Sequence, residues 1–288
     1  MTATTVDALA PAPGDRPEAA TSSVAWAVRD TAALTVRNLL HYVRVPELLV
    51  FTFVQPIMFV LLFRYVFGGS IPIPGLDYVD YLMPGIFGQT VVFGAIATGI
   101  GLSEDRASGI IERFRSLPMS RFAVLAGRTA ADLTRNFGVM IVMFAIGVLV
   151  GFRPEGGAAR IALAIVLLLG FALSLSWVFA NVGLRAANAE AAQAVSFPIL
   201  FPLTFASSAF VPVSNMPGWL QAFANHQPVT IVVNAARALM LGPEAAAGLR
   251  EAEILTASTT SYVLRSIAWI IGILAVFVPL AIRRFNRL

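Results

Sequence analysis

The sequence predicts an all-α membrane protein that crosses the bilayer with six helices. Of its 288 residues, 58% are hydrophobic and 12% are charged, and the mean hydropathy is +0.79. Soluble domains carry about 25% charged residues. Apolar runs of about twenty residues recur along the chain, which is the length that an α-helix needs to cross hydrocarbon, whereas a transmembrane β-barrel shows short alternating segments. We therefore expect a polytopic helical bundle.

Residue types that are missing exclude several functions. All 20 basic residues are arginine, so the chain cannot form a phosphate-binding loop of the GxxxxGK type. There is no cysteine for disulfide or thiolate chemistry. With only two isolated histidines, His41 and His226, we expect no metal site. The pI of about 10.1 is assigned to arginines that orient the chain in the membrane, not to nucleic-acid binding.

The N-terminal region divides into a tail and a helix. Residues 1–22 are rich in alanine, proline and threonine and are expected to form a disordered cytoplasmic tail, not a signal peptide. Residues 23–288 are expected to form one transmembrane domain. An amphipathic helix is predicted from about Val24 to Val45, which suits the cytoplasmic headgroup region or a protein surface. The apolar face includes Val28, Val36 and Leu40, and the polar side includes Arg37, His41 and Arg44.

Six apolar runs account for the predicted spans. Proline is tolerated inside a membrane helix and kinks it, so the first span is expected to bend at Pro56 and the fifth at Pro198 and Pro202. The glycine-rich second span permits close helix contact. Asp132 and Arg135 mark the cytoplasmic end of the third span. The spans cover about residues 47–67, 81–100, 133–150, 161–182, 193–213 and 262–282.

Polar and aromatic side chains within the spans are candidates for a substrate path. Glutamines inside spans either hydrogen-bond between helices or contact a substrate. Phenylalanines of the second and fifth spans either line an apolar path or pack within the bundle. The candidates are Gln55, Phe87, Gln89, Phe201 and Phe205.

The segment before the last span is predicted to lie outside. It contains an apolar helix of about 14 residues, which is too short to cross a bilayer. Asn234 and Arg237 within that helix also argue against a span. We therefore expect one or two short re-entrant helices in residues 214–261 that dip into the outer interface.

The distribution of arginine predicts the orientation. With six spans, both termini and the loop between the second and third spans share one side, and that side collects 14 of the 20 arginines. Arginine-rich loops remain in the cytoplasm. Both termini and the central loop are therefore expected to be cytoplasmic in a bacterial plasma membrane.

A charged segment from Ser103 to Arg121 separates the second and third spans. Ser103 is a suitable N-cap, and acidic residues follow in the first turn, where the helix dipole favours anions. Pro118 would end the helix. The sequence predicts one cytoplasmic helix over about residues 104–117, which either ties two spans together or docks into a separate protein.

Three motifs resemble the type-2 ABC exporter permeases, in particular the daunorubicin-resistance (DrrB-type) family. The segment EDRASGIIERFRSLP is similar to the family pattern E....G..ER....P, and FVLLFRYVFGG at 59–69 resembles the end of the first span. NHQPVTIVVNAARAL at 225–239 resembles the N.NP......A.R stretch before the last span. Arg64 and the pair His226-Gln227 depart from the family pattern. The positions that match the two spaced patterns are Glu104, Gly109, Glu112, Arg113, Pro118, Asn225, Pro228, Ala235 and Arg237.

The resemblance implies a transport subunit rather than an enzyme. It implies a dimer of separate ABC ATPase subunits that bind ATP and Mg, no cofactor in this chain, and a second permease half that is another copy or a related chain. The halves would meet at the first and fifth spans. The amphipathic helix, with Arg37, His41 and Arg44, would also contact the ATPase. The implied ATPase-coupling residues are Glu104, Asp105, Arg106, Gly109, Glu112, Arg113, Phe114, Arg115 and Pro118.

Amphiphilic drugs or lipids are the expected cargo because the predicted lining is mainly apolar. A polysaccharide or lipid-linked glycan is the alternative within the family. An ion-coupled secondary carrier would usually carry buried carboxylates and an internal repeat, and a membrane enzyme would need convergent polar residues within the bilayer. The sequence shows neither pattern.

Overall fold

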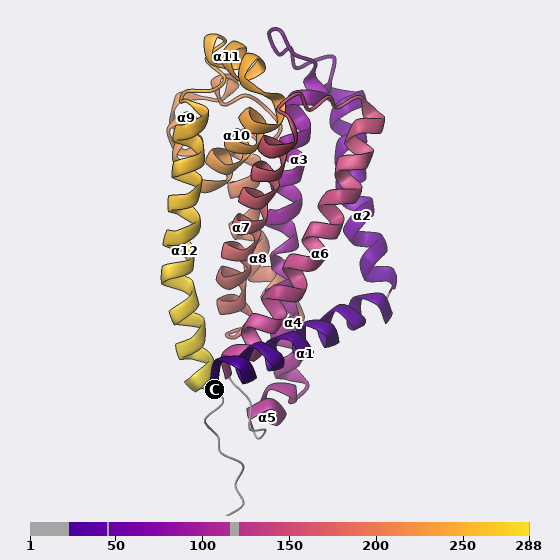
Figure 1. Ribbon diagram of the computed structural model, residues 1–288, viewed down its shortest axis with the longest axis vertical. Helices are drawn as coiled ribbons and strands as arrows, with labels where there is room; N and C mark the ends of the chain where they lie inside the picture. Colours follow the sequence, from indigo (N-terminus) through magenta and orange to yellow (C-terminus); the bar gives the residue numbers. More distant parts are fainter. Residues whose placement is uncertain (1–22, 45, 116–120, 288) are drawn as a thin grey trace, which may run out of the picture.

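The computed structural model describes residues 23–44, 46–115 and 121–287, and regular structure within these ranges is helical without a strand. Most helices run along the long axis of a bundle (Figure 1). One end, here called the lower end, carries α1 (Ser23–Arg44), α5 (Ile110–Arg115) and the C-terminus. The opposite, upper end carries α9 (Gly218–His226) and α11 (Pro243–Glu251). The predicted tail, 1–22, lies outside the described residues.

Four helical stretches are long and apolar enough to cross a membrane, namely 78–107, 122–150, 158–183 and 259–287. They agree with the second, third, fourth and last predicted spans. The helices at the first and fifth predicted spans run beside them but are shorter, so six spans remain a prediction. The lengthwise helices are α2 (Pro46–Leu61) with a π-helical continuation (Leu62–Phe67), α3 (Tyr78–Gly94) with α4 (Ile96–Ala107), α6 (Arg121–Val150), α7 (Ala158–Gly183), α8 (Ala189–Phe205) and α12 (Thr259–Arg287).

The core of the bundle is built around α3. Its residues 78–92 are all buried. In α12, by contrast, only 6% of an 18-residue apolar stretch is buried. Gly85 allows the close approach, because a Cβ at that position would lie 1.7 Å from the carbonyl oxygen of Ala209. Small residues permit such backbone contact between membrane helices. α12 therefore lies at the periphery, with most of its surface outside the protein core.

The fifth predicted span is shorter than expected, because α8 ends at Phe205 rather than continuing to Val213. The chain beyond it leaves the helix, and the freed carbonyl groups accept hydrogen bonds from side chains. The Tyr78 hydroxyl donates to the Phe210 carbonyl at 2.9 Å, and the Tyr81 hydroxyl donates to the Ser208 carbonyl at 3.0 Å. Non-helical backbone at membrane depth requires such partners.

The segment that follows contains three short α-helices, and the middle one, α10 (Pro228–Leu241), is enclosed by protein. Every residue from Val229 to Leu241 is buried, and α10 packs against α3, α7 and α12. Protein encloses this apolar helix more fully than we expected, and its re-entrant placement stays a prediction. The polar side chains that argued for an interfacial position are satisfied inside the bundle.

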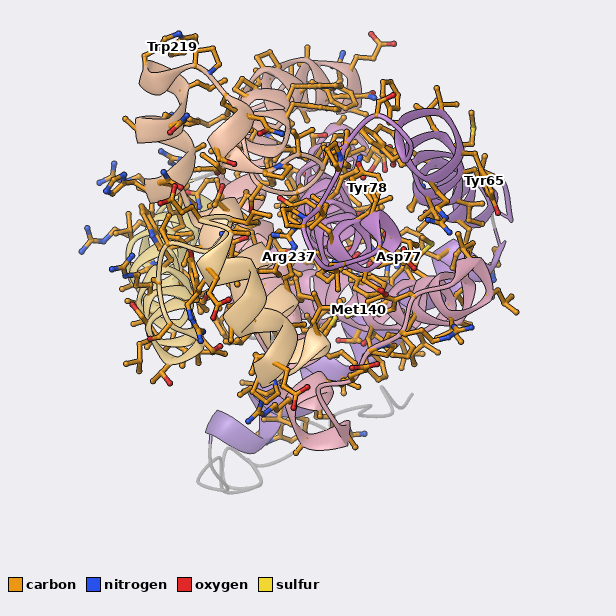
Figure 2. The ribbon with its side chains drawn as sticks, turned by 90° about the horizontal axis from the view of Figure 1, so that it is seen from above. Tyr65, Asp77, Tyr78, Met140, Trp219 and Arg237 are labelled. Carbon is orange, nitrogen blue, oxygen red and sulfur yellow. The ribbon has the colours of Figure 1, made fainter. Side chains whose placement is uncertain are left out.

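Arg237 is the centre of this arrangement. It is fully buried, and its guanidinium donates to the Tyr81 carbonyl at 3.0 Å, the Ser208 carbonyl at 2.7 Å and the Asn234 side-chain oxygen. Its Cζ lies 3.7 Å from the ring centroid of Tyr81. Seen from the upper end, Arg237 lies in the interior beside α3, while Tyr65 and Trp219 lie at the periphery (Figure 2). Arg237 thus joins α10 to α3 and to the chain after α8.

The N-terminal helix α1 lies across the lower end and packs mainly against α6 (Figure 1). Leu34 and Tyr42 are buried in this contact, and a Cβ at Gly127 would lie 2.7 Å from the Cβ of Leu34. The predicted apolar face points elsewhere: its members Val28 and Val36 are 63% and 55% exposed. α1 therefore packs on the bundle through one side and leaves apolar side chains uncovered on another.

Candidate functional site

The charged segment forms the lowest part of the described structure, but it is not the single helix that the sequence predicted. α4 continues through Ser103 to Ala107, and the Ser103 hydroxyl bonds to the Ile100 carbonyl at 2.6 Å instead of capping a helix. The chain turns at Gly109, whose φ of +72° favours glycine. A separate short helix, α5, then begins at Ile110 and projects beyond the bundle (Figure 1). The prediction of one helix over 104–117 is wrong because the span helix does not end where a suitable cap is available.

Several predicted coupling residues point back into the chain. Asp105 is 9% exposed and forms an ion pair of 2.9 Å with Arg37 of α1. Arg37 also lies over the ring of Phe114, with its Cζ 5.2 Å from the centroid. Arg106 donates to the Leu184 carbonyl at 3.0 Å, at the end of α7. These side chains connect the charged segment to α1 and α7.

The remaining predicted coupling residues form the exposed part of the segment. Glu104 at the end of α4, and Glu112 and Arg113 on α5, are all exposed. Arg44 of α1 is also exposed. Pro118 and the side chains of Arg115 and His41 lie outside the described part of the chain. The residues on which a partner could act directly are therefore the exposed ones that flank Gly109.

A buried polar cluster supports the lower end. Asp132 of α6 is fully buried and accepts hydrogen bonds from Tyr42 of α1 at 2.7 Å and from Thr98 of α4. Arg128, one turn earlier, lies 3.7 Å from the same carboxylate. Burial, and then the charge of Asp132, raise the pKa of Tyr42 to about 12, so its hydroxyl remains a donor at neutral pH. The cluster fixes α1 against α4 and α6.

Sequence reasoning missed this cluster. It took Asp132 and Arg135 as markers of a span end, although α6 already begins at Arg121. An acidic residue four positions after an arginine, next to an apolar run, was the available signal. Partners on distant segments, Tyr42 and Thr98, carry no such mark in the sequence.

The five candidate substrate-path residues separate into two groups. Gln55 lines a pocket between α2, α3, α4, α6 and α8, and Phe201 and Phe205 of α8 are 45% and 41% exposed. Phe87 and Gln89 are instead 1% exposed, within α3. The ring of Phe87 contacts those of Phe144 and Phe152, which are core contacts. Gln55 therefore lines the pocket together with Phe197, whose ring neighbours Phe201, whereas Phe87 and Gln89 lie in the core.

Phenylalanine rings connect α2 to α8 along the surface shared by these two helices. Between ring centroids, Phe59 of α2 lies 6.4 Å from Phe205 of α8, and Phe63 of the π-helical continuation lies 4.5 Å from Phe210, which is buried in the chain after α8. Phe201 and Phe205 stack at 5.5 Å on consecutive turns of α8. Such arrays are adaptable apolar surfaces. Within the described residues, no group of three or more His, Asp or Glu residues could hold a metal ion.

The pattern of a known transporter family matches residues 29–241, described as ABC-2 type transporter. This range includes α5, α10 and the α2–α8 surface, and it covers most of the chain. The chain belongs to the ABC-2 type transporter family. This confirms the family that the three sequence motifs indicated.

Two similar chains are named as drug-resistance permeases and a third as a putative transport permease. The daunorubicin resistance ABC transporter permease protein DrrB1 of Streptomyces coeruleorubidus is 32% identical over 273 residues, which cover 95% of this chain and 90% of that protein. The probable doxorubicin resistance ABC transporter permease protein DrrC of Mycobacterium tuberculosis H37Rv is 28% identical over 218 residues, covering 75% and 78%. The putative transport permease ycf38 of Cyanophora paradoxa is 25% identical over 217 residues, covering 74% of each chain. As an ABC-2 permease with long apolar helices, the chain is a multi-pass membrane protein and a component of a transport system.

Proposed function

We propose that the chain is the membrane-spanning subunit of an ATP-driven exporter that moves amphiphilic drugs or lipids out of the cytoplasm or the inner leaflet. A separate dimer of ABC ATPase subunits, with ATP and Mg, supplies the energy. Relatives named for daunorubicin and doxorubicin resistance support a drug-like cargo. The phenylalanine-rich surface of α2 and α8 supports an amphiphile over a polar solute.

The observation that carries the proposal is the exposed turn at the lower end. Glu104, Glu112 and Arg113 are exposed around Gly109, and α5 projects beyond the bundle (Figure 1). Ile111 of α5 is 1% exposed and anchors this short helix to the bundle. The exposed charges on its other side suit binding in a groove of another protein. We propose α5 and the end of α4 as the coupling element, with Asp105, Arg106 and Phe114 holding it rather than contacting the ATPase.

Force on the coupling element has a defined route into the bundle. The Asp105–Arg37 ion pair would transmit the force to α1. The hydrogen bond from Arg106 to the Leu184 carbonyl would transmit it to the end of α7. α4 itself is continuous with α3 except for a break at Ala95. Closure of the ATPase dimer is thereby converted into a rigid-body shift of helices.

The second permease half is proposed to meet this chain at α2 and α8. Both helices expose large apolar side chains, and the substrate path would open between the two halves. We place the termini and α5 in the cytoplasm of a bacterial cell, with six spans and α9 to α11 as the outer segment. The exposed apolar residues are Val54, Met58, Leu61, Val195, Ile199, Phe201 and Phe205.

The coupling proposal is tested by replacing both exposed charges of α5, Glu112 and Arg113, with alanine. We expect an inserted, folded chain whose ATP-driven export falls at least about tenfold, because each charge-assisted contact with the ATPase contributes about 1.5–3 kcal/mol. Export of a fluorescent anthracycline and ATP hydrolysis are measured in vesicles that contain the chain and its co-purified ATPase.

The matched control removes the same charges at another exposed place on the lower end. Arg185, exposed in the turn after α7, and Glu190, exposed in the first turn of α8, are replaced with alanine and should leave export unchanged. Full export by the Glu112→Ala/Arg113→Ala chain, or an equal loss in the control, would contradict the role of α5.

A further inference from the structure

A pocket of about 270 Å³ lies where α2, α3, α4, α6 and α8 meet. Its apolar wall includes Phe93, Val139 and Phe197, and the helix break at Ala95 forms one side. Its described lining contains one cation, Arg135, and no acidic residue. The polar lining residues are Thr52, Gln55, Thr90, Arg135, Asn136 and Gln193.

Two residues that line this pocket each carry a buried hydrogen-bond donor without an acceptor. Arg135 donates through Nη2 to the Gly94 carbonyl at 2.7 Å, but its Nε is buried without a hydrogen-bond partner. Asn136 is 1% exposed, and its Nδ2 is likewise buried and unpaired. Buried polar groups are nearly always paired, so both groups indicate a ligand that accepts hydrogen bonds.

The charge of Arg135 has no acidic partner among the described residues. The nearest acid along α6 is Asp132, but its Oδ1 accepts from Tyr42, and its Oδ2 accepts from Thr98 and lies 3.7 Å from Arg128. The Arg135 guanidinium lies instead over the Tyr42 ring, 4.9 Å from the centroid. A cation with a buried, unpaired Nε and no counter-ion indicates that the missing acceptor is anionic.

The position of the pocket indicates where that anion comes from. Contact of Arg135 with Tyr42 places the pocket near α1, which crosses the lower end (Figure 1). In the proposed orientation this is the boundary between inner headgroups and hydrocarbon. The apolar wall of the pocket, with Phe93, Val139 and Phe197, suits the part of an acyl chain next to that headgroup.

We propose that this pocket binds the phosphate headgroup of an anionic phospholipid from the inner leaflet. Arg135 and Asn136 donate to the phosphate oxygens, and the acyl chains begin against the apolar wall of the pocket. Gly94 is required because a Cβ there would lie 2.2 Å from the Asn136 side-chain oxygen. The proposal rests on the proposed orientation but not on the identity of the cargo.

The test measures lipid binding to the purified full-length chain by native mass spectrometry in a neutral detergent. Phosphatidylglycerol, phosphatidylcholine and inorganic phosphate are the three probes. We expect one phosphatidylglycerol to bind at least about tenfold more tightly than phosphatidylcholine, as charge-assisted contacts predict. Millimolar inorganic phosphate should not displace it. Equal affinity for the two lipids would overturn the site, and full displacement by phosphate would overturn the lipid as its occupant.

Three substitutions locate the binding. Arg135→Gln and Asn136→Leu should each weaken phosphatidylglycerol binding about tenfold, whereas Arg160→Gln, an exposed arginine outside the pocket, should not. Asn136→Leu should also leave the lipid-free unfolding temperature unchanged or raised, because it removes an unpaired donor. The Asn136→Leu variant therefore still tests the site if the Arg135→Gln chain fails to fold. Equal weakening by Arg160→Gln would contradict the site.

Lipid binding and export are independent readouts. Binding is measured without the ATPase, so its failure leaves the exporter proposal intact. A chain that binds phosphatidylglycerol normally but does not export would instead count against the proposed function.

Discussion

Arg237 shows how a cation is held in an apolar bundle through carbonyl groups. Its guanidinium bonds to the Tyr81 and Ser208 carbonyls and to Asn234, and it forms no ion pair among the described residues. Ser208 also donates to the Asn234 side-chain oxygen at 2.8 Å. The network satisfies backbone that α8 leaves unpaired where it ends. Arg237 is therefore a structural residue of the upper end.

Replacing Arg237 with glutamine is expected to lower the free energy of unfolding by about 3 kcal/mol, because the buried Tyr81 and Ser208 carbonyl groups each lose a charged donor. Unfolding is followed in detergent through tryptophan fluorescence. Arg250→Gln, at an exposed position of α11, is the control and should change stability by less than about 0.5 kcal/mol. Equal stability of the two variants would show that the Arg237 contacts do not hold the fold.

The sequence could identify Arg237 as a distinctive residue, but it could not predict its burial. A short apolar helix containing an arginine and an asparagine is normally placed outside hydrocarbon. The acceptors here are main-chain carbonyls, which every residue carries, so no pattern marks them. Similarly, Asp105 and Arg106 resemble an exposed charge run until Arg37 and the Leu184 carbonyl are brought beside them.

At the scale of elements, α4 and α7 form the closest backbone contact near the coupling element. A Cβ at Gly183 would lie 2.1 Å from the Gly99 carbonyl oxygen, and a Cβ at Gly99 would lie 2.7 Å from the Phe179 carbonyl oxygen. The helices are thus held together directly above the Arg106 contact with the end of α7. Movement of α4 must carry α7 with it.

Gly183→Ala is expected to separate α4 from α7, lowering stability by about 1–3 kcal/mol through overpacking and reducing export. The control is Gly138→Ala on α6, where an added Cβ meets nothing within 4 Å. That change should be neutral or stabilising by about 1 kcal/mol because alanine favours the helix. Thermal unfolding and vesicle export are measured for both. A harmless Gly183→Ala would contradict the tight contact.

Element boundaries were predicted less well than element positions. Hydropathy located α7 and α12 within a few residues, because apolar length decides a span. It misplaced the starts of α5 and α6 and the end of α8. Ser103 permits a helix start but does not require one, and α4 passes through it. The charged part of α6 remains helical because Asp132 accepts hydrogen bonds from α1 and α4, and Arg128 donates to the Ala97 carbonyl of α4 at 3.1 Å.

For the whole molecule, α1, α5 and the C-terminus share one end, as the arginine distribution predicted for one side of the membrane (Figure 1). Arginine counts determine sidedness because they reflect insertion rather than packing. Which end faces the cytoplasm stays a prediction. The chain has no cysteine, so labelling of a single introduced cysteine shows on which side of the membrane that residue lies.

In right-side-out vesicles, a membrane-impermeant maleimide is expected to label Glu155→Cys but not Glu112→Cys until the membrane is opened. Both positions are exposed, and they lie in the turn between α6 and α7 and on α5. Glu155 is preferable to Gly156, where a side chain would lie 1.9 Å from the Leu239 carbonyl oxygen. The reverse labelling pattern would overturn the orientation and, with it, the assignment of α5 to the ATPase.

The contact between Arg237 and Tyr81 also has a consequence for biosynthesis, since the two residues are 156 positions apart. A ribosome makes α3 long before α10, so α3 enters the membrane while its later neighbours do not yet exist. Until α10 has been translated, the carbonyl groups of Tyr81 and Ser208 lack the Arg237 guanidinium, although the Tyr81 hydroxyl can already donate to Ser208. The contacts that join α10 to α3 and to the chain after α8 therefore form late in synthesis. We expect a product that stops before Arg237 to lack these contacts permanently and to be degraded by membrane quality control.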